Sequence, residues 1–253
     1  MEKPRVIVFT TAYYPFVGGS EIAIEEICRR LKDRFDFYIV TSRFRRDLPG
    51  REVRSEGTVI RVGFGNGLDK YLLPFWKLTN LDTPCPSMIV GVDISHASIA
   101  AAIYKFLHPR TPFLLNIQFG ESGERLASGR LGVMGLAFKF MLWQADYVTA
   151  ISTYLLELAR DYGYRGRAEV LPNGVDIGKF AHRPSPIANR TKKVVVTTSR
   201  LVSKNGIDIL IRAIAEVKKI ISAKSLTKEF PNIFTGPIFL FARPVPREWA
   251  IPL

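Results

Sequence analysis

The sequence predicts an α/β protein built on a Rossmann-like, doubly wound parallel sheet. Short runs rich in β-branched residues alternate with amphipathic helical segments along most of the chain. The order strand, helix, strand favours right-handed β–α–β units, whose strands pair in parallel. With 47% apolar residues among 253, the chain has enough apolar surface for a substantial core.

The first β–α–β unit shows this pattern most clearly. Residues 5–10 (RVIVFT) and 35–42 (FDFYIVTS) are predicted buried strands. Between them, residues 20–31 place apolar side chains on one helical face and charged side chains on the other. Ser20 is the candidate N-cap of this helix.

The following elements repeat the alternation up to residue 177. Residues 42–57 are a charged connection containing Pro-Gly, and Gly163 is a typical residue at which a helix stops. The further predicted strands are 58–65, 88–97, 111–120, 146–152 and 167–176, and the further predicted helices are 97–107, 137–145 and 153–163.

A second α/β domain is predicted to begin after a linker. Residues 178–193 are polar and contain two prolines, which is typical of a hinge between domains. Residues 194–201 then form a new strand and residues 205–219 a new amphipathic helix. No further β–α units follow in 194–253, so we expect a truncated second domain with an atypical tail.

Charge and cysteine content narrow the function classes. The net charge of +13 suits nucleic acid, anionic lipid surfaces or phosphate-bearing substrates. A nucleic-acid-binding protein is disfavoured, because the charges do not interleave with aromatic residues in a binding motif. Cys28 and Cys85 form no framework, which favours a cytoplasmic location. No metal site is expected, since the cysteines and histidines do not cluster.

The pair Gly18-Gly19 between the first strand and its helix has two interpretations. It is either a tight β–α connection or a place where the backbone approaches a ligand closely. The loop has no G-x-G-x-x-G pattern, so the nicotinamide-binding fingerprint is absent.

Four segments stand in the order and spacing of a known family. They read PFVGGSEIAIEEICRRL, ADYVTAISTYLLELARDYG, VLPNGVDIGKF and SRLVSKNGIDILIRA. Together they resemble the retaining GT-B glycosyltransferases of family 4. The resemblance covers the amino-terminal domain (1–177) and the first β–α unit of the second. It implies a sugar passing from a nucleotide-diphosphate sugar to an acceptor, with retention.

The resemblance also implies binding residues. The family's Gly-Gly loop near donor and acceptor falls on Gly18 and Gly19, and its following acidic residue on Glu21, which also suits the helix dipole. Arg200 and Lys204 match the basic pair that neutralises the donor diphosphate, a task suited to fixed cations. Without the surrounding motif, these two would read as solvated charges.

Two further positions complete the set. Gln118 stands where the family often has a histidine; glutamine hydrogen-bonds sugar hydroxyls but does not shuttle protons at neutral pH. Asn173, in an Asn-Gly turn, is expected to be mainly structural through unusual backbone angles, with a minor binding role. No catalytic residue is assigned.

The main alternative is a catalytically inactive, acceptor-binding remnant or an interaction subunit. The glutamates after Lys204 lack the spacing of the family's donor-binding pair. We expect no cofactor beyond the nucleotide sugar, and a glycan, polysaccharide or lipid-linked acceptor. The segments YLLPFWKL and LGVMGLAFKFMLW suggest peripheral contact with the inner face of the membrane. Half-buried core helices explain the same segments and are slightly favoured over membrane contact.

Overall fold

The computed structural model describes residues 2–16, 18–79, 85–118, 133–180, 197 and 206–223. The chain divides into two compact units after Val175. The domain boundaries expected at 177 and 193 stay a prediction.

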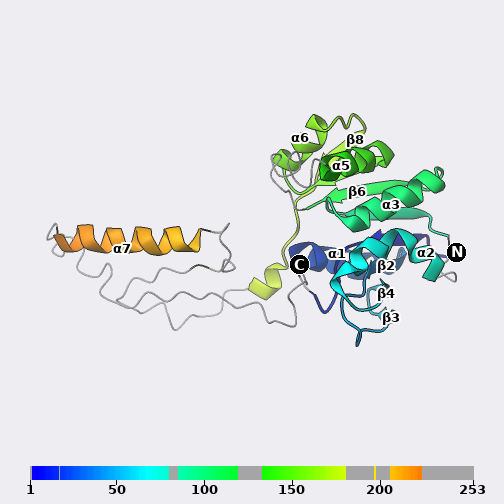
Figure 1. The fold of residues 1–253 in the computed structure, drawn as a ribbon, viewed down its shortest axis with the longest axis horizontal. Helices are drawn as coiled ribbons and strands as arrows, with labels where there is room; N and C mark the ends of the chain where they lie inside the picture. The colour runs from blue at the N-terminus through cyan, green and yellow to red at the C-terminus, as the bar shows by residue number, and fades with distance from the viewer. Residues whose placement is uncertain are drawn as a thin grey trace. The chain divides into compact units, whose positions relative to one another are not determined.

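The first unit is built on one eight-stranded sheet (Figure 1). Its order is β3-β4-β2-β1-β5-β6-β7-β8, and every neighbouring pair is parallel except β3 with β4. This confirms the predicted fold class. The strands are β1 Arg5–Phe9, β2 Asp36–Ser42, β3 Arg51–Arg54, β4 Gly57–Val62, β5 Met88–Val92, β6 Phe113–Ile117, β7 Tyr147–Ala150 and β8 Arg167–Val170.

Strand β3 corrects the prediction of a plain charged connection. Its sequence, Arg-Glu-Val-Arg, has no buried apolar period, so sequence pattern gives no strand signal. The strand exists because it pairs antiparallel with β4, from Arg51 opposite Ile60 to Arg54 opposite Gly57. An edge strand needs only one partner and tolerates charged side chains.

The predicted helices are observed where the sequence placed them, but their ends differ from the predicted ends. Ser152 caps α6 by accepting a hydrogen bond from the Leu155 amide, and Gly163, with φ of 98°, follows the end of that helix. A 3₁₀ helix, η1, was not predicted. The helical elements are α1 Gly19–Leu31, η1 Gly67–Phe75, α2 Trp76–Thr79, α3 His96–Leu107, α5 Val133–Gln144, α6 Thr153–Asp161, η3 Ile177–Phe180 and α7 Ile207–Ala223.

Alternating strand residues build an apolar core on each face of the sheet. Ile7, Ile89 and Leu115 belong to the core formed with η1, α3 and α5, in which α3 packs against both η1 and α5. Val8 and Ile39 belong to the core formed with α1. Both faces of the central strands are therefore covered, as a parallel sheet requires.

Little of the second unit belongs to the described residues. Helix α7 confirms the helix predicted over 205–219. The predicted strand 194–201, apart from Thr197, and most of the linker lie outside the described residues. Among the described helices, none is long and apolar enough to cross a membrane.

Candidate functional site

The candidate site lies at the carboxyl edge of the sheet, where the strand order reverses. β2 and β5 lie on opposite sides of β1, so the connections after β1 and β5 start from neighbouring strands. Open α/β sheets bind ligands at such a point. The first connection leads to Gly18, Gly19 and Glu21, and the second begins at Asp93.

Neither glycine of the pair is required by backbone conformation. Gly18 is extended, with φ of −122°, and Gly19 lies outside the left-handed region. A Cβ on Gly19 would meet nothing within 4 Å, whereas one on Gly18 would collide with the Glu21 carboxylate. A tight turn therefore does not explain the glycine at position 19. No described residue fills the space beside Gly19, so this space could hold part of a ligand.

Gly18, and not Ser20, is the N-cap of α1, which corrects the predicted cap. The amides of Gly18 and of Glu21 itself lie within hydrogen-bonding reach of the Glu21 carboxylate and lower its pKa. A carboxylate that reaches back to the N-cap amide supplies one half of a capping box. Glu21 thus helps to cap helix α1. If Glu21 also binds substrate, the same carboxylate serves both roles.

Burial is the main cause that raises the pKa of Glu21, and the nearby charge of Asp93 adds to it. The hydrogen bonds from Gly18, from Glu21 itself and from Ser20 act in the opposite direction but do not cancel the rise. A carboxylate whose pKa is raised by burial and by a second carboxylate is a frequent property of functional sites.

Asp93 is a site residue that sequence reasoning missed. It directly follows β5 and has φ of 65°, a conformation that few residues other than glycine adopt. Its Oδ1 accepts a hydrogen bond from the Gln118 amide at 2.8 Å, and its own amide donates to the Asn116 carbonyl at 2.8 Å. The only sequence signal was an acidic residue directly after a buried strand.

The side chain of Gln118 is held on both sides. Its Nε2 donates to Asn116 Oδ1 at 2.8 Å, and its Oε1 accepts from Asn173 Nδ2 at 2.9 Å. Asn116 in turn donates to Thr149 Oγ1 at 2.8 Å. These four residues form an amide relay from β7 across β6 to the segment after β8. Counting only partners among the described residues, Gln118 keeps one N–H and one lone pair beyond this relay.

Asn173 differs from its expected structural role. Neither Asn173 nor Gly174 has a positive φ, so unusual backbone angles do not explain the pair. Instead, the exposed Asn173 brings its amide to Gln118, 55 positions earlier in the chain. The structure therefore joins Gln118 with Asn173 by a hydrogen bond, and it brings the charge of Asp93 near enough to raise the pKa of Glu21. Arg200 and Lys204 lie outside the described residues.

Two further observations concern possible binding sites elsewhere in the described residues. A pocket of about 360 Å³ lies at the opposite, amino end of β2 and β4, lined among others by Phe37, Arg54 and Gly57, and does not include the predicted residues. In the part of the chain that the structure describes, no three His, Cys, Asp or Glu side chains gather as metal ligands would.

The comparison with protein families decides the relationship. Residues 17–179 match the family described as Glycosyltransferase Family 4, a span that holds the whole polar cluster. The chain belongs to glycosyltransferase family 4. A curated relative of this family 4 chain is the GDP-mannose-dependent alpha-(1-6)-phosphatidylinositol monomannoside mannosyltransferase of Mycolicibacterium smegmatis, strain ATCC 700084 / mc(2)155. The two are 34% identical over 105 residues, which is 38% of this chain and 28% of that protein.

Solved structures share the fold at low sequence identity. Sucrose-phosphate synthase from Thermosynechococcus elongatus has a TM-score of 0.70 at 12% identity, covering 96% of the family 4 chain and 71% of that chain. A structure described as trehalose-6-phosphate from E. coli bound with UDP-2-fluoro glucose has a TM-score of 0.64 at 12% identity, covering 97% and 75%. A UDP-GlcNAc 2-epimerase from Methanocaldococcus jannaschii has 0.51 at 13% identity, covering 97% and 74%. Because the last name denotes an epimerase, the fold alone does not specify the reaction.

Proposed function

We propose that this chain takes part in transferring a sugar, with retention, from a nucleotide-diphosphate donor to a glycan or lipid-linked acceptor. The observation that carries the proposal is the polar cluster of Glu21, Asp93, Gln118 and Asn173 at the topological switch point. Family membership over residues 17–179 supports the same activity.

The cluster suits recognition of sugar hydroxyls. Gln118 offers a donor and an acceptor that are fixed in place by the hydrogen bonds to Asn116 and Asn173. The carboxylates of Glu21 and Asp93 accept hydrogen bonds from hydroxyl groups. The open space at Gly19 would let the sugar or its phosphate come close to the backbone.

Leaving-group stabilisation is assigned to the beginning of the second domain. As the bond to the anomeric carbon breaks, negative charge gathers on the departing nucleoside diphosphate. Arg200 would bind the phosphate oxygens in bidentate fashion, and Lys204 would act beside it as a point charge. The sugar would pass through an oxocarbenium-like state, as in glycoside cleavage. No side chain is assigned to bond formation.

Calorimetric titration tests donor binding. The curated relative is named as GDP-mannose-dependent, so GDP-mannose is the first probe and UDP-glucose the second. Gln118→Ala and Asn173→Ala should each weaken binding of the sugar nucleotide about tenfold, while affinity for GDP alone changes little. Gln144→Ala on α5 is the matched control, because Gln144 lies outside the relay.

Product analysis tests the transfer step. Radiolabelled GDP-mannose and lipid or glycan acceptors should give a glycosylated product whose anomeric configuration equals that of the donor. Acceptor binding without any donor binding or transfer would favour an acceptor-binding unit instead. Salt-sensitive binding to nucleic acid, with no sugar-nucleotide binding, would contradict the proposal.

We also propose peripheral contact with an anionic membrane. In η1 and α2, Leu68 and Phe75 are exposed beside Lys70 and Lys77. One face of α5 belongs to the core, as expected of a half-buried helix, because Phe138 and Met141 are buried. The other face exposes Leu136, Lys139 and Trp143. Exposed aromatic residues beside lysines are typical of surfaces that bind the lipid interface.

Flotation with phosphatidylglycerol vesicles tests this contact. Leu136→Ser combined with Trp143→Ser should reduce the bound fraction several-fold, and raised salt should release the wild-type chain. Tyr154→Ser on α6 replaces another exposed aromatic residue and should leave binding unchanged. Equal loss with Tyr154→Ser, or no binding by the wild type, would contradict a specific membrane surface.

A further inference from the structure

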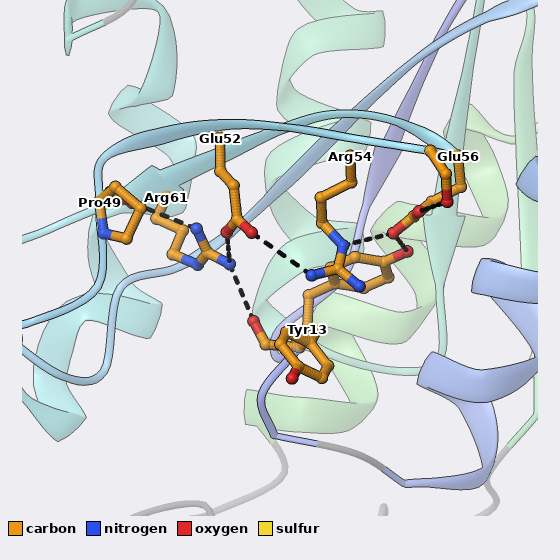
Figure 2. Close-up of polar contacts among 8 residues, drawn as sticks. Tyr13, Pro49, Glu52, Arg54, Glu56 and Arg61 are labelled. Carbon is orange, nitrogen blue, oxygen red and sulfur yellow. Dashed lines mark hydrogen bonds and ion pairs between the residues drawn. The ribbon is translucent and has the colours of Figure 1, made fainter.

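The β3–β4 hairpin carries a chain of alternating charges, shown in Figure 2. Arg54 Nε lies 2.6 Å from Glu56 Oε1, and Arg54 Nη1 lies 3.4 Å from Glu52 Oε1. The other oxygen of Glu52 lies 2.7 Å from Arg61 Nη2. Each charged group therefore has a neighbour of opposite charge, in the order Glu56, Arg54, Glu52, Arg61.

Both ends of this chain are buried. The side chains of Glu56 and Arg61 are each 1% exposed. Burial of a charge without a partner would be strongly unfavourable, so the pairing is necessary for the hairpin to pack at all. Gly57 allows the close approach, because its φ is 152° and a Cβ at this position would lie only 2.5 Å from the Phe37 carbonyl oxygen.

The buried ends contact the connection between β1 and α1 (Figure 2). Tyr13 donates its hydroxyl hydrogen to Glu56 Oε1 at 3.1 Å, and Arg61 Nη2 donates to the Tyr14 carbonyl at 2.9 Å. The Arg54 guanidinium lies 4.2 Å from the centre of the Tyr14 ring. Two consecutive residues of the connection are thus held by three side chains of the hairpin.

We propose that the β3–β4 hairpin positions the connection that ends in Gly18 and Gly19, with Glu56 and Arg61 as positioning residues for the candidate site. The inference rests on the proposed function, in which this connection lies beside the donor. Glu56 and Arg61 act only through Tyr13 and Tyr14, since neither belongs to the carboxyl-edge cluster. The charged hairpin is thereby a support for the site.

Tyr13→Phe tests the proposal with minimal disturbance, because it removes one hydroxyl and keeps the buried ring. The matched control is Tyr147→Phe, which removes a tyrosine–glutamate hydrogen bond of the same length, 3.1 Å to Glu169 Oε2, between β7 and β8. A second control, Phe138→Leu, lowers stability from the buried face of α5.

The first measurement follows the connection itself. Cys28 is 1% exposed and shares the apolar cluster of Tyr13, whereas Cys85 is exposed. In a Cys85→Ser background, loosening of the connection exposes Cys28 to N-ethylmaleimide. Tyr13→Phe should increase the labelling rate about tenfold, and Tyr147→Phe should leave it unchanged. An unchanged rate in Tyr13→Phe would overturn the proposal.

The second measurement is GDP-mannose affinity by calorimetry. Tyr13→Phe should weaken binding about tenfold, whereas Tyr147→Phe and Phe138→Leu should match the wild type. Unchanged affinity in Tyr13→Phe, or an equal loss in Phe138→Leu, would overturn the positioning role. If the wild type binds neither GDP-mannose nor UDP-glucose, the proposed function fails. The labelling rates alone then decide whether the hairpin holds the connection.

Discussion

The two polar networks of the first unit arrange their charges in opposite ways. In the β3–β4 hairpin, every carboxylate pairs with a guanidinium. Burial alone would raise the pKa of Glu56, but hydrogen bonds from Arg54 and Ser55 and the charge of Arg54 lower it overall. At the carboxyl edge, Glu21 lies near the charge of Asp93, and its pKa is raised.

This difference separates a structural network from a candidate binding site. The hairpin satisfies its charges through pairs within it and through hydrogen bonds to the connection between β1 and α1. The carboxyl edge holds a carboxylate in an unfavourable environment and amides with remaining hydrogen-bonding capacity. A ligand that donates hydrogen bonds would relieve the second network and leave the first unchanged.

Removing Arg61 should have the largest effect on stability. Arg61→Met leaves the Tyr14 and Pro49 carbonyls without their donor and leaves Glu52 with only its longer contact to Arg54. We therefore expect a loss of about 3 kcal/mol in the free energy of unfolding. Urea denaturation measures this loss. The control Arg29→Met removes a solvent-exposed pair with Glu26 and should cost less than about 1 kcal/mol. Equal losses would mean that burial does not distinguish the pairs.

Glu56→Gln should have the next largest effect, about 2 kcal/mol, because glutamine keeps the shape but loses the charge that faces Arg54. The folded pKa of Glu56 is lowered. Its carboxylate therefore contributes stability above the unfolded pKa, about 4.3, and this contribution is lost as pH falls through the folded value. The variant should show a smaller loss of stability on acidification. An unchanged acid profile would contradict the charge argument.

Glu21→Gln should act in the opposite direction. Because the folded pKa of Glu21 is raised, its ionised form is unfavourable, and stability from the protonated group is lost as pH rises through the folded value. The variant should gain up to about 1 kcal/mol near pH 7 and bind GDP-mannose more weakly. Urea titrations of both glutamate variants at pH 7 check the sign. If both Glu21→Gln and Glu56→Gln lowered stability at pH 7, the two networks would not differ in the way proposed.

Gly19→Ala should have the smallest effect on stability, within about 0.5 kcal/mol, because no atom lies within 4 Å of the added methyl group. Binding of GDP-mannose should nevertheless weaken. Gly163→Ala, at φ of 98°, is the control in which the backbone does require glycine, and it should cost about 1 kcal/mol. If Gly19→Ala lowered stability and left GDP-mannose affinity unchanged, Gly19 would serve only the connection between β1 and α1 and not ligand binding.

The alternation of β-branched runs and amphipathic helices was enough to predict the parallel sheet, since burial on both faces leaves a local pattern in each strand. The spacing of four segments was enough to recognise the family. The sequence also singled out Gly18, Gly19, Glu21, Gln118 and Asn173, but as separate positions.

Only the tertiary structure decided which of these residues meet. Gln118 and Asn173 form one amide relay because the end of β6 and the segment after β8 reach the same edge. The charge of Asp93 acts on Glu21 because β5 adjoins β1. The burial of Glu56 and Arg61 was likewise invisible to local pattern, which treats charged residues as solvated. Local periodicity indicates on which face of a helix or strand a residue lies. Which residues it contacts, and how deeply it is buried, depend on strand order and register.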